Sequence, residues 1–330
     1  MADSDAVLAL DLGATQIRAA VVTADGAVHE RRRASTPSRD GPDAVVEACI
    51  RTLRSVRAAY RVTEPDLAGR LVGIGIAAPG PVDPFRGVIV DPPNMGPSFR
   101  DIALAERVGA ALGLRTVLDR DTQVAAMAEA AHGAARGCSD FLYVTVSTGI
   151  GGAIVSDGHL LRGPDGAAGE LGHLLIDRQG PRCGCGARGH LEAIASGVAI
   201  AAAGRAAAER RESPVLADLL SEHGPSFGAQ DVAAAEETGD SAAAAIMADA
   251  RDAFAQGCVS LVDIFNPERI VVGGSLARGQ GDRWLDPARE VVRRDAFRLA
   301  GQRVSIVPAE LGDDVGLVGG YELVRSRLGA

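Results

Sequence analysis

Two short glycine runs follow apolar segments in this chain and have the residue types of a phosphate-binding turn. The first is Asp11-Leu-Gly13-Ala14-Thr15, and the second is Ser147-Thr148-Gly149-Ile150-Gly151-Gly152. Glycine lets backbone N–H groups approach an anion closely, and an adjacent Thr hydroxyl adds a donor. Either run alone is equally typical of a glycine turn joining two strands. Two such turns, one in each half of the chain, predict a phosphate chain gripped between two lobes.

Asp121 and Asp11 are carboxylates placed where phosphate chemistry needs them. Asp121 stands at a predicted strand-to-helix junction, where it could cap the helix or act as a general base. Asp11 precedes the first glycine turn, where it could be a solvated strand end or orient Mg²⁺ through water. Phosphoryl transfer is mostly positioning and charge stabilisation, so one placed carboxylate plus Mg²⁺ is sufficient.

His173, Cys183, Cys185 and His190 form a candidate metal site. Two thiolates and two imidazoles are a ligand set suited to structural zinc, although a C-x-C pair can also be a reduced pair in a loop. A disulfide between the two cysteines is not expected in the cytosol. The other cysteines, Cys49, Cys138 and Cys258, have the helical or apolar context of small core residues.

Composition narrows the classes of function. A chain of 330 residues suits two domains, and 47% hydrophobic residues predict a well-cored protein. No apolar stretch approaches the roughly 18–20 residues of a membrane span, and the N-terminus lacks a charged-then-apolar leader, so we expect a cytoplasmic protein without a membrane partner. A net charge of −9 argues against nucleic acid as the main partner.

The chain contains no lysine, and all 34 basic residues are arginine. This excludes a Walker-type phosphate loop, a protein-kinase fold and Schiff-base chemistry, each of which needs a lysine amine. Phosphate binding must therefore use backbone amides, hydroxyls, a metal ion or arginine.

The elements that position these residues alternate between strands and helices in both halves. In the first half the patterns predict strands at 6–11, 16–22, 27–33, 71–77 and 115–118. They predict helices at 41–60, 101–112 and 122–135. In the second half they predict strands 141–146, 152–155, 269–272 and 304–308, and helices 193–211, 242–265, 284–299 and 313–328. The fold class expected is α/β.

At these motifs the sequence resembles the ROK (repressor, open reading frame, kinase) family of sugar kinases. The matching segments are Asp11 to Thr15, Arg120 to Ala126, Gly169 to His173, Cys183 to Glu192, and Asn266 to Gly274. The resemblance implies a two-lobed actin/hexokinase-type ATPase fold with an active-site cleft between the lobes. It places residues 1–118 and 313–330 in a small lobe and residues 119–312 in a large one. It also implies a homodimer.

The resemblance implies roles for residues of this chain. Asp121 is the general base, and Asn94, Arg120, Glu170, His173 and Glu192 line the sugar pocket together with it. The residues implied to bind ATP and Mg²⁺ come from the two glycine turns and from the glycine pair 273–274. They are Asp11, Gly13, Ala14, Thr15, Thr148, Gly149, Gly273 and Gly274. Zinc on the Cys/His set pins the loop that carries the sugar-binding groups. His190 stands where the family usually has Cys.

Arg120 departs from the family, which commonly has Asn before the catalytic Asp. The guanidinium could turn outward or pair with a neighbouring acid such as Asp119, or it could face an anionic or unusual acceptor. Glucose is the expected acceptor; N-acetylmannosamine, N-acetylglucosamine, a less common sugar or a cyclitol are alternatives. A catalytically impaired sugar-binding protein is the rival of another class. A repressor, or polyphosphate as phosphoryl donor, fits this acidic, lysine-free chain less well.

Overall fold

The chain folds into two compact α/β units. The computed structural model describes residues 5–64 and 70–329. Unit 1 comprises Met1–Gly137, Leu160–Ala168 and Glu310–Ala330, and unit 2 comprises Cys138–His159 and Gly169–Ala309. The prediction of an α/β fold in two parts is thereby confirmed.

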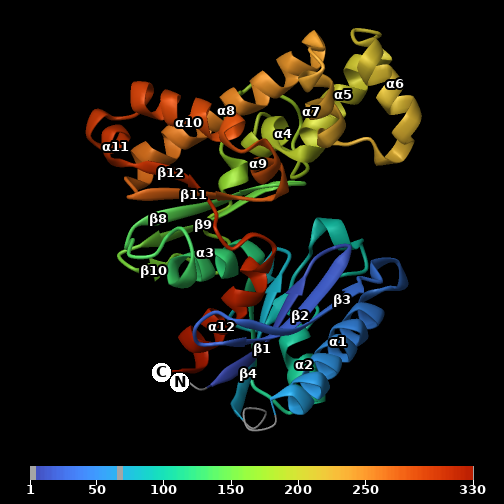
Figure 1. Ribbon diagram of the computed structural model, residues 1–330, viewed down its shortest axis with the longest axis vertical. Helices are drawn as coiled ribbons and strands as arrows, with labels where there is room; N and C mark the ends of the chain where they lie inside the picture. The colour runs from blue at the N-terminus through green and yellow to red at the C-terminus, as the bar shows by residue number, and fades with distance from the viewer. Residues whose placement is uncertain (1–4, 65–69, 330) are drawn as a thin grey trace. The chain divides into compact units, whose positions relative to one another are not determined.

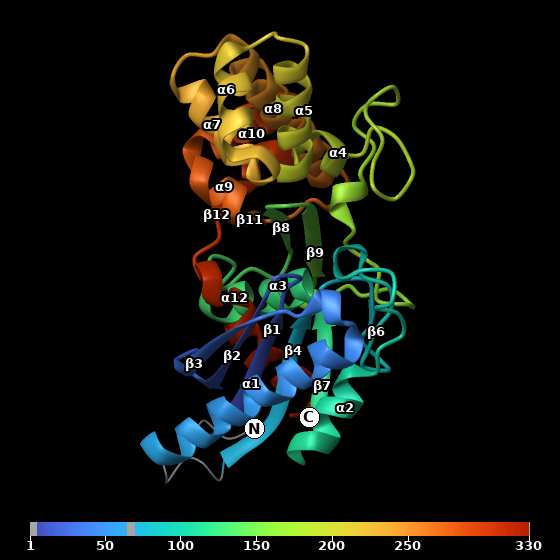
Figure 2. The same ribbon diagram turned by 90° about the vertical axis from the view of Figure 1, so that its right-hand side faces the viewer.

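Unit 1 is built on a five-stranded sheet in the order β3-β2-β1-β4-β7 (Figures 1 and 2). β1 pairs antiparallel with β2, which pairs antiparallel with β3, whereas β1, β4 and β7 run parallel. The strands are β1 (Ala6–Leu12), β2 (Gln16–Thr23), β3 (Val28–Ser35), β4 (Leu71–Ala78) and β7 (Thr116–Arg120), with a small hairpin of β5 (Val82–Asp83) and β6 (Val88–Ile89). The helices are α1 (Pro42–Thr63), α2 (Leu104–Leu112), α3 (Asp121–His132) and α12 (Val315–Leu328).

Helices cover both faces of this sheet, as Figures 1 and 2 show. The alternation of β1 explains the arrangement, because successive side chains of a strand point to opposite faces. Leu8, Leu10 and Leu12 pack in the core formed with α1 and α2. Val7 and Ala9 pack instead with Leu317 and Tyr321 of α12. The strand is therefore apolar on both sides, as its continuous apolar sequence predicts.

Glycines let α12 lie directly against the sheet. A Cβ atom on Gly75 of β4 would be 2.0 Å from the carbonyl oxygen of Gly320, and one on Gly319 would be 2.2 Å from the carbonyl oxygen of Val124 in α3. Side chains at these positions would push the helix away from β4 and α3. The C-terminal helix is thus packed into unit 1 by close backbone contact.

Unit 2 repeats the same sheet topology, in the order β10-β9-β8-β11-β12. β8 pairs antiparallel with β9, and β8, β11 and β12 run parallel. The strands are β8 (Phe141–Val146), β9 (Ile150–Ser156), β10 (His159–Leu160), β11 (Arg269–Gly273) and β12 (Ser305–Pro308). The helices are α4 (Leu191–Ala195), α5 (Gly197–Glu209), α6 (Pro214–His223), α7 (Ala229–Glu237), α8 (Ser241–Phe265), α9 (Ser275–Gln280), α10 (Asp282–Asp295) and α11 (Arg298–Arg303).

The shared topology makes the two glycine runs equivalent. The first joins β1 to β2, and the second joins β8 to β9, so each lies at the hairpin next to the first parallel strand pair of its sheet. The predicted strand–turn–strand pattern is correct at both places.

Several predicted elements differ from the structure. The helix expected over 193–211 is broken at Ser196, whose hydroxyl accepts the N–H of Ala199 and caps a new helix, α5. The helix expected over 284–299 ends at Asp295. Unit 1 also extends past residue 118 through α3, because α3 packs along α12. Among the described residues, no helix has the length and apolar character needed to cross a membrane.

Candidate functional site

Three acids converge in unit 1 beside the first glycine turn. Asp11 is the last residue but one of β1, Asp121 begins α3, and Asp313 lies in the turn η6 (Gly312–Asp314) that precedes α12. Burial raises the pKa of Asp11 to about 6; Arg18, at 3.6 Å, opposes the shift, and the charges of Asp121 and Asp313 add to it. A desolvated carboxylate among other acids gains from a nearby divalent cation, and carboxylate oxygens are ligands that Mg²⁺ accepts.

Asp121 is exposed and locally fixed. It is the first residue of α3, and one of its carboxylate oxygens accepts the N–H of Thr122 at 2.7 Å. Arg120 occupies the N-cap position, so Asp121 is not the cap residue itself. An exposed carboxylate held in one orientation can accept a proton from a bound hydroxyl.

The first glycine turn is tied to the loop that follows β3. The N–H of Gly13 donates to the carbonyl of Gln16 at 2.9 Å, and the Thr36 hydroxyl donates to the carbonyl of Gly13 at 2.7 Å. The carbonyl of Thr15 accepts the N–H of Thr36. Ala14 is half-buried, and Thr15 is exposed at the tip of the turn. The carbonyls are engaged in the fold, which suits a turn whose outward face presents donors.

The second glycine turn borders a cavity of about 550 Å³ in unit 2. The turn is held by α5, because the N–H groups of Gly197 and Val198 donate to the carbonyls of Ser147 and Thr148. The cavity is lined by this turn, one face each of α5 and α7, and α9: Ser147, Thr148, Gly197, Val198, Ala201, Phe227, Gly228, Ala229, Gln230, Ala233, Ala234, Glu237, Ser275, Leu276, Gly279 and Gln280. Its size and its mixture of apolar and hydroxyl-bearing residues suit a nucleotide.

Close packing explains why Gly273 and Gly274 are glycines. A Cβ atom on Gly273 would be 2.4 Å from the Tyr143 hydroxyl, and one on Gly274 would be 2.3 Å from the carbonyl oxygen of Val146. Both glycines therefore allow the end of β11 to lie close to β8. Ser275, which follows them, reaches the cavity and shares a hydrogen bond of 2.8 Å with Ser147.

The four predicted metal ligands meet in unit 2. The candidate ligand atoms of His173, Cys183, Cys185 and His190 all lie within 4.8 Å of one another. The two Nδ1 atoms are 3.1 Å apart, and the sulfur-to-Nδ1 distances are 3.7 Å (Cys183 to His173) and 3.3 Å (Cys185 to His190). Zinc bonds of about 2.0–2.3 Å in a tetrahedron require ligand separations of roughly 3.3–3.8 Å. The separations, from 3.1 Å to at most 4.8 Å, extend to either side of this range, so small shifts of the four side chains would give them the geometry of a zinc site.

Two predicted sugar-binding acids surround this cluster. Glu170 is exposed, and its Oε2 lies 3.9 Å from Nε2 of His173, the ring nitrogen that faces away from the cluster. Glu192 lies in the first turn of α4 and accepts the N–H of Ile150 at 2.9 Å. Asn94, the predicted sugar-binding amide of unit 1, is exposed in the short helix η3 (Pro93–Met95).

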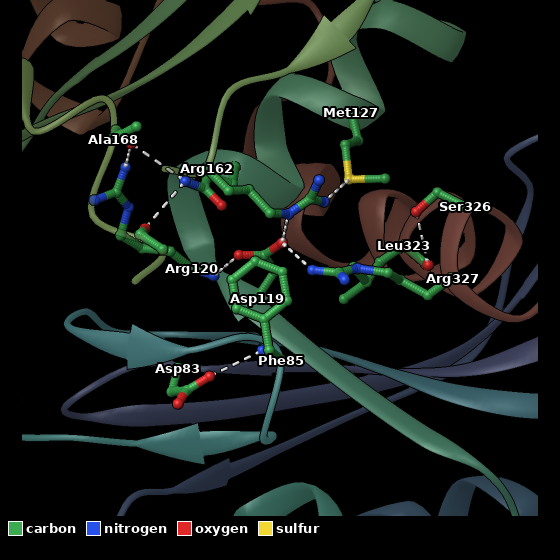
Figure 3. A network of polar contacts seen from close by, with 12 residues as sticks. Asp83, Phe85, Asp119, Arg120, Met127, Arg162, Ala168, Leu323, Ser326 and Arg327 are labelled. Carbon is green, nitrogen blue, oxygen red and sulfur yellow. Dashed lines mark hydrogen bonds and ion pairs between the residues drawn. The ribbon is translucent and has the colours of Figure 1, made fainter. Parts of the chain in front are cut away.

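Arg120 is buried, with 5% of its surface exposed, in a polar network centred on Asp119 (Figure 3). Its Nε donates to the Thr122 hydroxyl at 3.1 Å and its Nη2 donates to the carbonyl of Ala168 at 2.7 Å. Asp119 accepts the backbone N–H of Arg120 and pairs with the guanidinium groups of Arg162 and Arg327, at 2.8 and 3.9 Å. The sequence is compatible with an outward orientation, an acidic partner or a bound acceptor for the Arg120 guanidinium. The main-chain carbonyl of Ala168 is a partner that it does not predict.

Sequence reasoning missed several of these residues. Asp313 joins the acids, and α7 supplies one wall of the cavity, yet neither was among the predicted site residues. The sequence does contain signals for the starts of α6 and α7. Ser213 caps α6, with Pro214 at its first position, and Asp231 accepts the N–H of Gly228 at the start of α7. Which helix face borders a cavity is a tertiary property that these signals do not carry.

Comparison with known proteins gives a consistent result. Residues 7–327 match the sequence profile of the ROK family. A glucokinase of Halalkalibacterium halodurans is 31% identical over 96% of this chain and 94% of its own. An N-acetylmannosamine kinase of Citrobacter koseri is 33% identical over 96% of this chain and 98% of its own. The crystal structure of a ROK family glucokinase from Streptomyces griseus in complex with glucose and AMPPNP is 28% identical, with a TM-score of 0.79, over 97% of this chain and 99% of that one.

Proposed function

Because this chain belongs to the ROK family, we propose that it is an ATP-dependent sugar kinase of the actin/hexokinase-type fold. It transfers the γ-phosphoryl group of ATP to a hexose hydroxyl, with glucose as the first candidate acceptor. Relatives that cover the whole chain are named glucokinase, and a similar structure binds glucose and AMPPNP. The observation that carries the proposal is Asp121, an exposed carboxylate at the start of α3 whose charge acts on Asp11, the half-buried carboxylate beside the first glycine turn.

Asp121 is the proposed general base. It takes the proton of the sugar hydroxyl as the hydroxyl oxygen attacks phosphorus, and the leaving group is ADP. The Thr122 N–H holds the carboxylate in place. Asp11 and Asp313 are the groups that would hold Mg²⁺, directly or through water. When bound, this ion neutralises charge on the transferring phosphate.

The cavity of unit 2 is the proposed nucleotide site. Its apolar residues, such as Val198 and Phe227, suit the faces of a base, and the hydroxyls of Thr148 and Ser275 suit ribose or phosphate oxygens. Gly149, Gly273 and Gly274 contribute by permitting the backbone geometry beside this cavity. In unit 1, Ala14 and Thr15 are proposed to donate to the phosphates, and Gly13, whose own N–H is bonded to the carbonyl of Gln16, lets the backbone approach them closely.

Sugar recognition is assigned to Asn94, Glu170, His173 and Glu192. Carboxylates and amides bind pairs of hydroxyls, and a site built for a hydroxyl rejects analogues that lack it. We propose structural zinc on the cluster of His173, Cys183, Cys185 and His190. Zinc would fix the ring of His173, whose other nitrogen faces Glu170, and a carboxylate in that position orients a metal-bound histidine.

N-acetylmannosamine is the second candidate acceptor. The N-acetylmannosamine kinase of Citrobacter koseri covers this chain as completely as the glucokinases do. A homodimer is proposed on the family resemblance. Ile264, Phe297 and Leu299, each at least 64% exposed near the end of α8, give unit 2 apolar surface for such a contact.

An acceptor panel tests the function. Purified protein is given ATP, Mg²⁺ and one of glucose, mannose, N-acetylglucosamine, N-acetylmannosamine or inositol, and ADP release is measured. We expect phosphorylation of glucose or N-acetylmannosamine that is lost in Asp121→Asn. A folded protein that binds ATP and sugar but phosphorylates none of the panel would favour the impaired sugar-binding protein instead.

A further inference from the structure

The segment Leu160–Ala168 belongs to unit 1, although the chain on both sides of it belongs to unit 2. The segment is a closed loop, because the N–H of Ala168 donates to the carbonyl of Arg162 at 3.0 Å. It leads directly into Gly169 and Glu170, the first residues of the proposed sugar-binding stretch. The contacts that hold this loop in unit 1 therefore fix the position of the residue directly before that stretch.

Both ends of the loop are held by residues that flank Asp121. At the first end, Nε of Arg162 donates to the fully buried carboxylate of Asp119 at 2.8 Å. At the last end, the carbonyl of Ala168 accepts a hydrogen bond from Arg120, at 2.7 Å (Figure 3). It accepts a second one from Gln123, at 3.2 Å. Hydrogen bonds that involve a charged partner are about twice as strong as neutral ones.

The middle of the loop packs against the small hairpin of unit 1. Gly166 has φ of +84°, and a Cβ atom there would lie 2.6 Å from Cδ of Pro84. Gln123 is fully buried and reaches the carbonyl of Gly166 as well, at 3.4 Å. The loop is thus held at three points by β7, the first turn of α3 and the chain after β5.

We propose that Arg120 and Gln123 are positioning residues for sugar binding: by holding the carbonyl of Ala168 they fix the point from which the chain presents Glu170. The inference rests on the proposed sugar kinase function. Arginine suits this role where asparagine would not. Its long planar guanidinium donates from Nε to Thr122 and from Nη2 to Ala168 at once, and a short amide cannot span both acceptors.

Steady-state kinetics test the role. In Arg120→Gln the KM for the sugar should rise by roughly 10-fold to 100-fold, the value of one lost hydrogen bond from a charged donor. In Gln123→Leu it should rise by roughly 2-fold to 10-fold, because the amide donor of Gln123 is neutral. The KM for ATP should stay within about twofold, because neither Arg120 nor Gln123 lines the proposed nucleotide cavity. Arg120→Lys keeps the positive charge but loses the planar guanidinium, so its KM for the sugar should lie between those of the parent and Arg120→Gln.

Arg327→Gln is the matched control. Arg327 belongs to the same network, but its contacts are to Asp119 and to the ring of Phe85, at 5.3 Å from the ring centre. Its loss should lower thermal stability and leave the sugar KM within about twofold. A sugar KM that rises equally in Arg327→Gln, or that does not rise in Arg120→Gln, overturns the proposal.

Hydrogen exchange separates this inference from the kinase function. In Arg120→Gln, amides of residues 160–170 should exchange faster than in the parent, and in Arg327→Gln they should not. If the parent phosphorylates no sugar, the proposed function fails, while the exchange result still decides whether Arg120 holds the loop. Unchanged exchange over 160–170 in Arg120→Gln overturns the positioning role even in an active kinase.

Discussion

Glu192 accepts a hydrogen bond from the backbone N–H of Ile150, with 2.9 Å between Oε2 and the nitrogen. This contact joins the loop of the metal cluster to the second glycine turn. It also explains Gly149, because a Cβ atom there would lie 2.5 Å from the same carboxylate oxygen. The other oxygen, Oε1, lies 4.0 Å from the Cys183 sulfur. Glu192 therefore has a structural partner in addition to its proposed sugar.

Two substitutions separate the roles of Glu192. Glu192→Gln keeps a carbonyl oxygen for the Ile150 N–H, so its free energy of unfolding should stay near that of the parent, while the sugar KM rises. Glu192→Ala removes the acceptor and should also lose about 1–3 kcal/mol of stability. Urea unfolding and sugar kinetics measure the two effects. Equal loss of stability in both variants would show that the charge, not the hydrogen bond, holds the turn.

The metal cluster predicts about one zinc ion per chain. Elemental analysis of purified protein should find it, and Cys183→Ala should lose it and unfold at a lower temperature, since metal bound only by the folded state stabilises that state. Cys138→Ala is the control, because this thiol lies outside the cluster. Stoichiometric zinc that persists in the Cys183→Ala, Cys185→Ala double variant would contradict the ligand assignment.

Asp121→Asn should abolish most phosphoryl transfer. The amide keeps the shape of the side chain and loses the proton acceptor, so kcat should fall by roughly 10²–10⁴-fold while nucleotide binding and stability change little. Asp43→Asn is a matched control: this exposed carboxylate also lies in the first turn of a helix, α1. Activity of Asp121→Asn within about threefold of the parent would leave Asp121 only a structural role.

Asp11 predicts that stability falls as pH rises from about 4 to about 6. Its pKa is raised from 3.8 to about 6 in the folded protein, so over that interval the folded state binds more protons than the unfolded state. The contribution of Asp11 to the free energy of unfolding is fully present below pH 4, where the carboxyl is protonated. It falls by about 3 kcal/mol in total as Asp11 ionises. Arg18, Asp121 and Asp313 are the charges that act on it.

Urea unfolding at several pH values measures this slope, with Asp11→Asn as reference. The variant cannot ionise at this position, so the parent-minus-variant difference should decrease steadily between pH 4 and pH 6 and level off above. A difference that stays constant with pH would mean that the Asp11 pKa is the same in the folded and unfolded states.

Local features were readable from the sequence. The strand of residues 141–146 matches β8, because a short run of apolar and β-branched residues before a glycine turn has few other conformations. The metal ligands are separated by at most 17 positions along one loop, so their convergence needed little long-range information. The glycine turns were likewise set by the residues within them.

By itself the sequence determined the α/β class, the two glycine turns and the composition of the metal cluster, since these depend on near neighbours in the chain. Tertiary structure decided the rest. Arg120 bonds a carbonyl 48 positions away, and buried Glu129 of α3 accepts the N–H groups of Glu310 and Leu311, more than 180 positions away. The physical reason is that a long polar side chain can reach many acceptors, and only the packed chain determines which acceptor lies beside it once water is excluded.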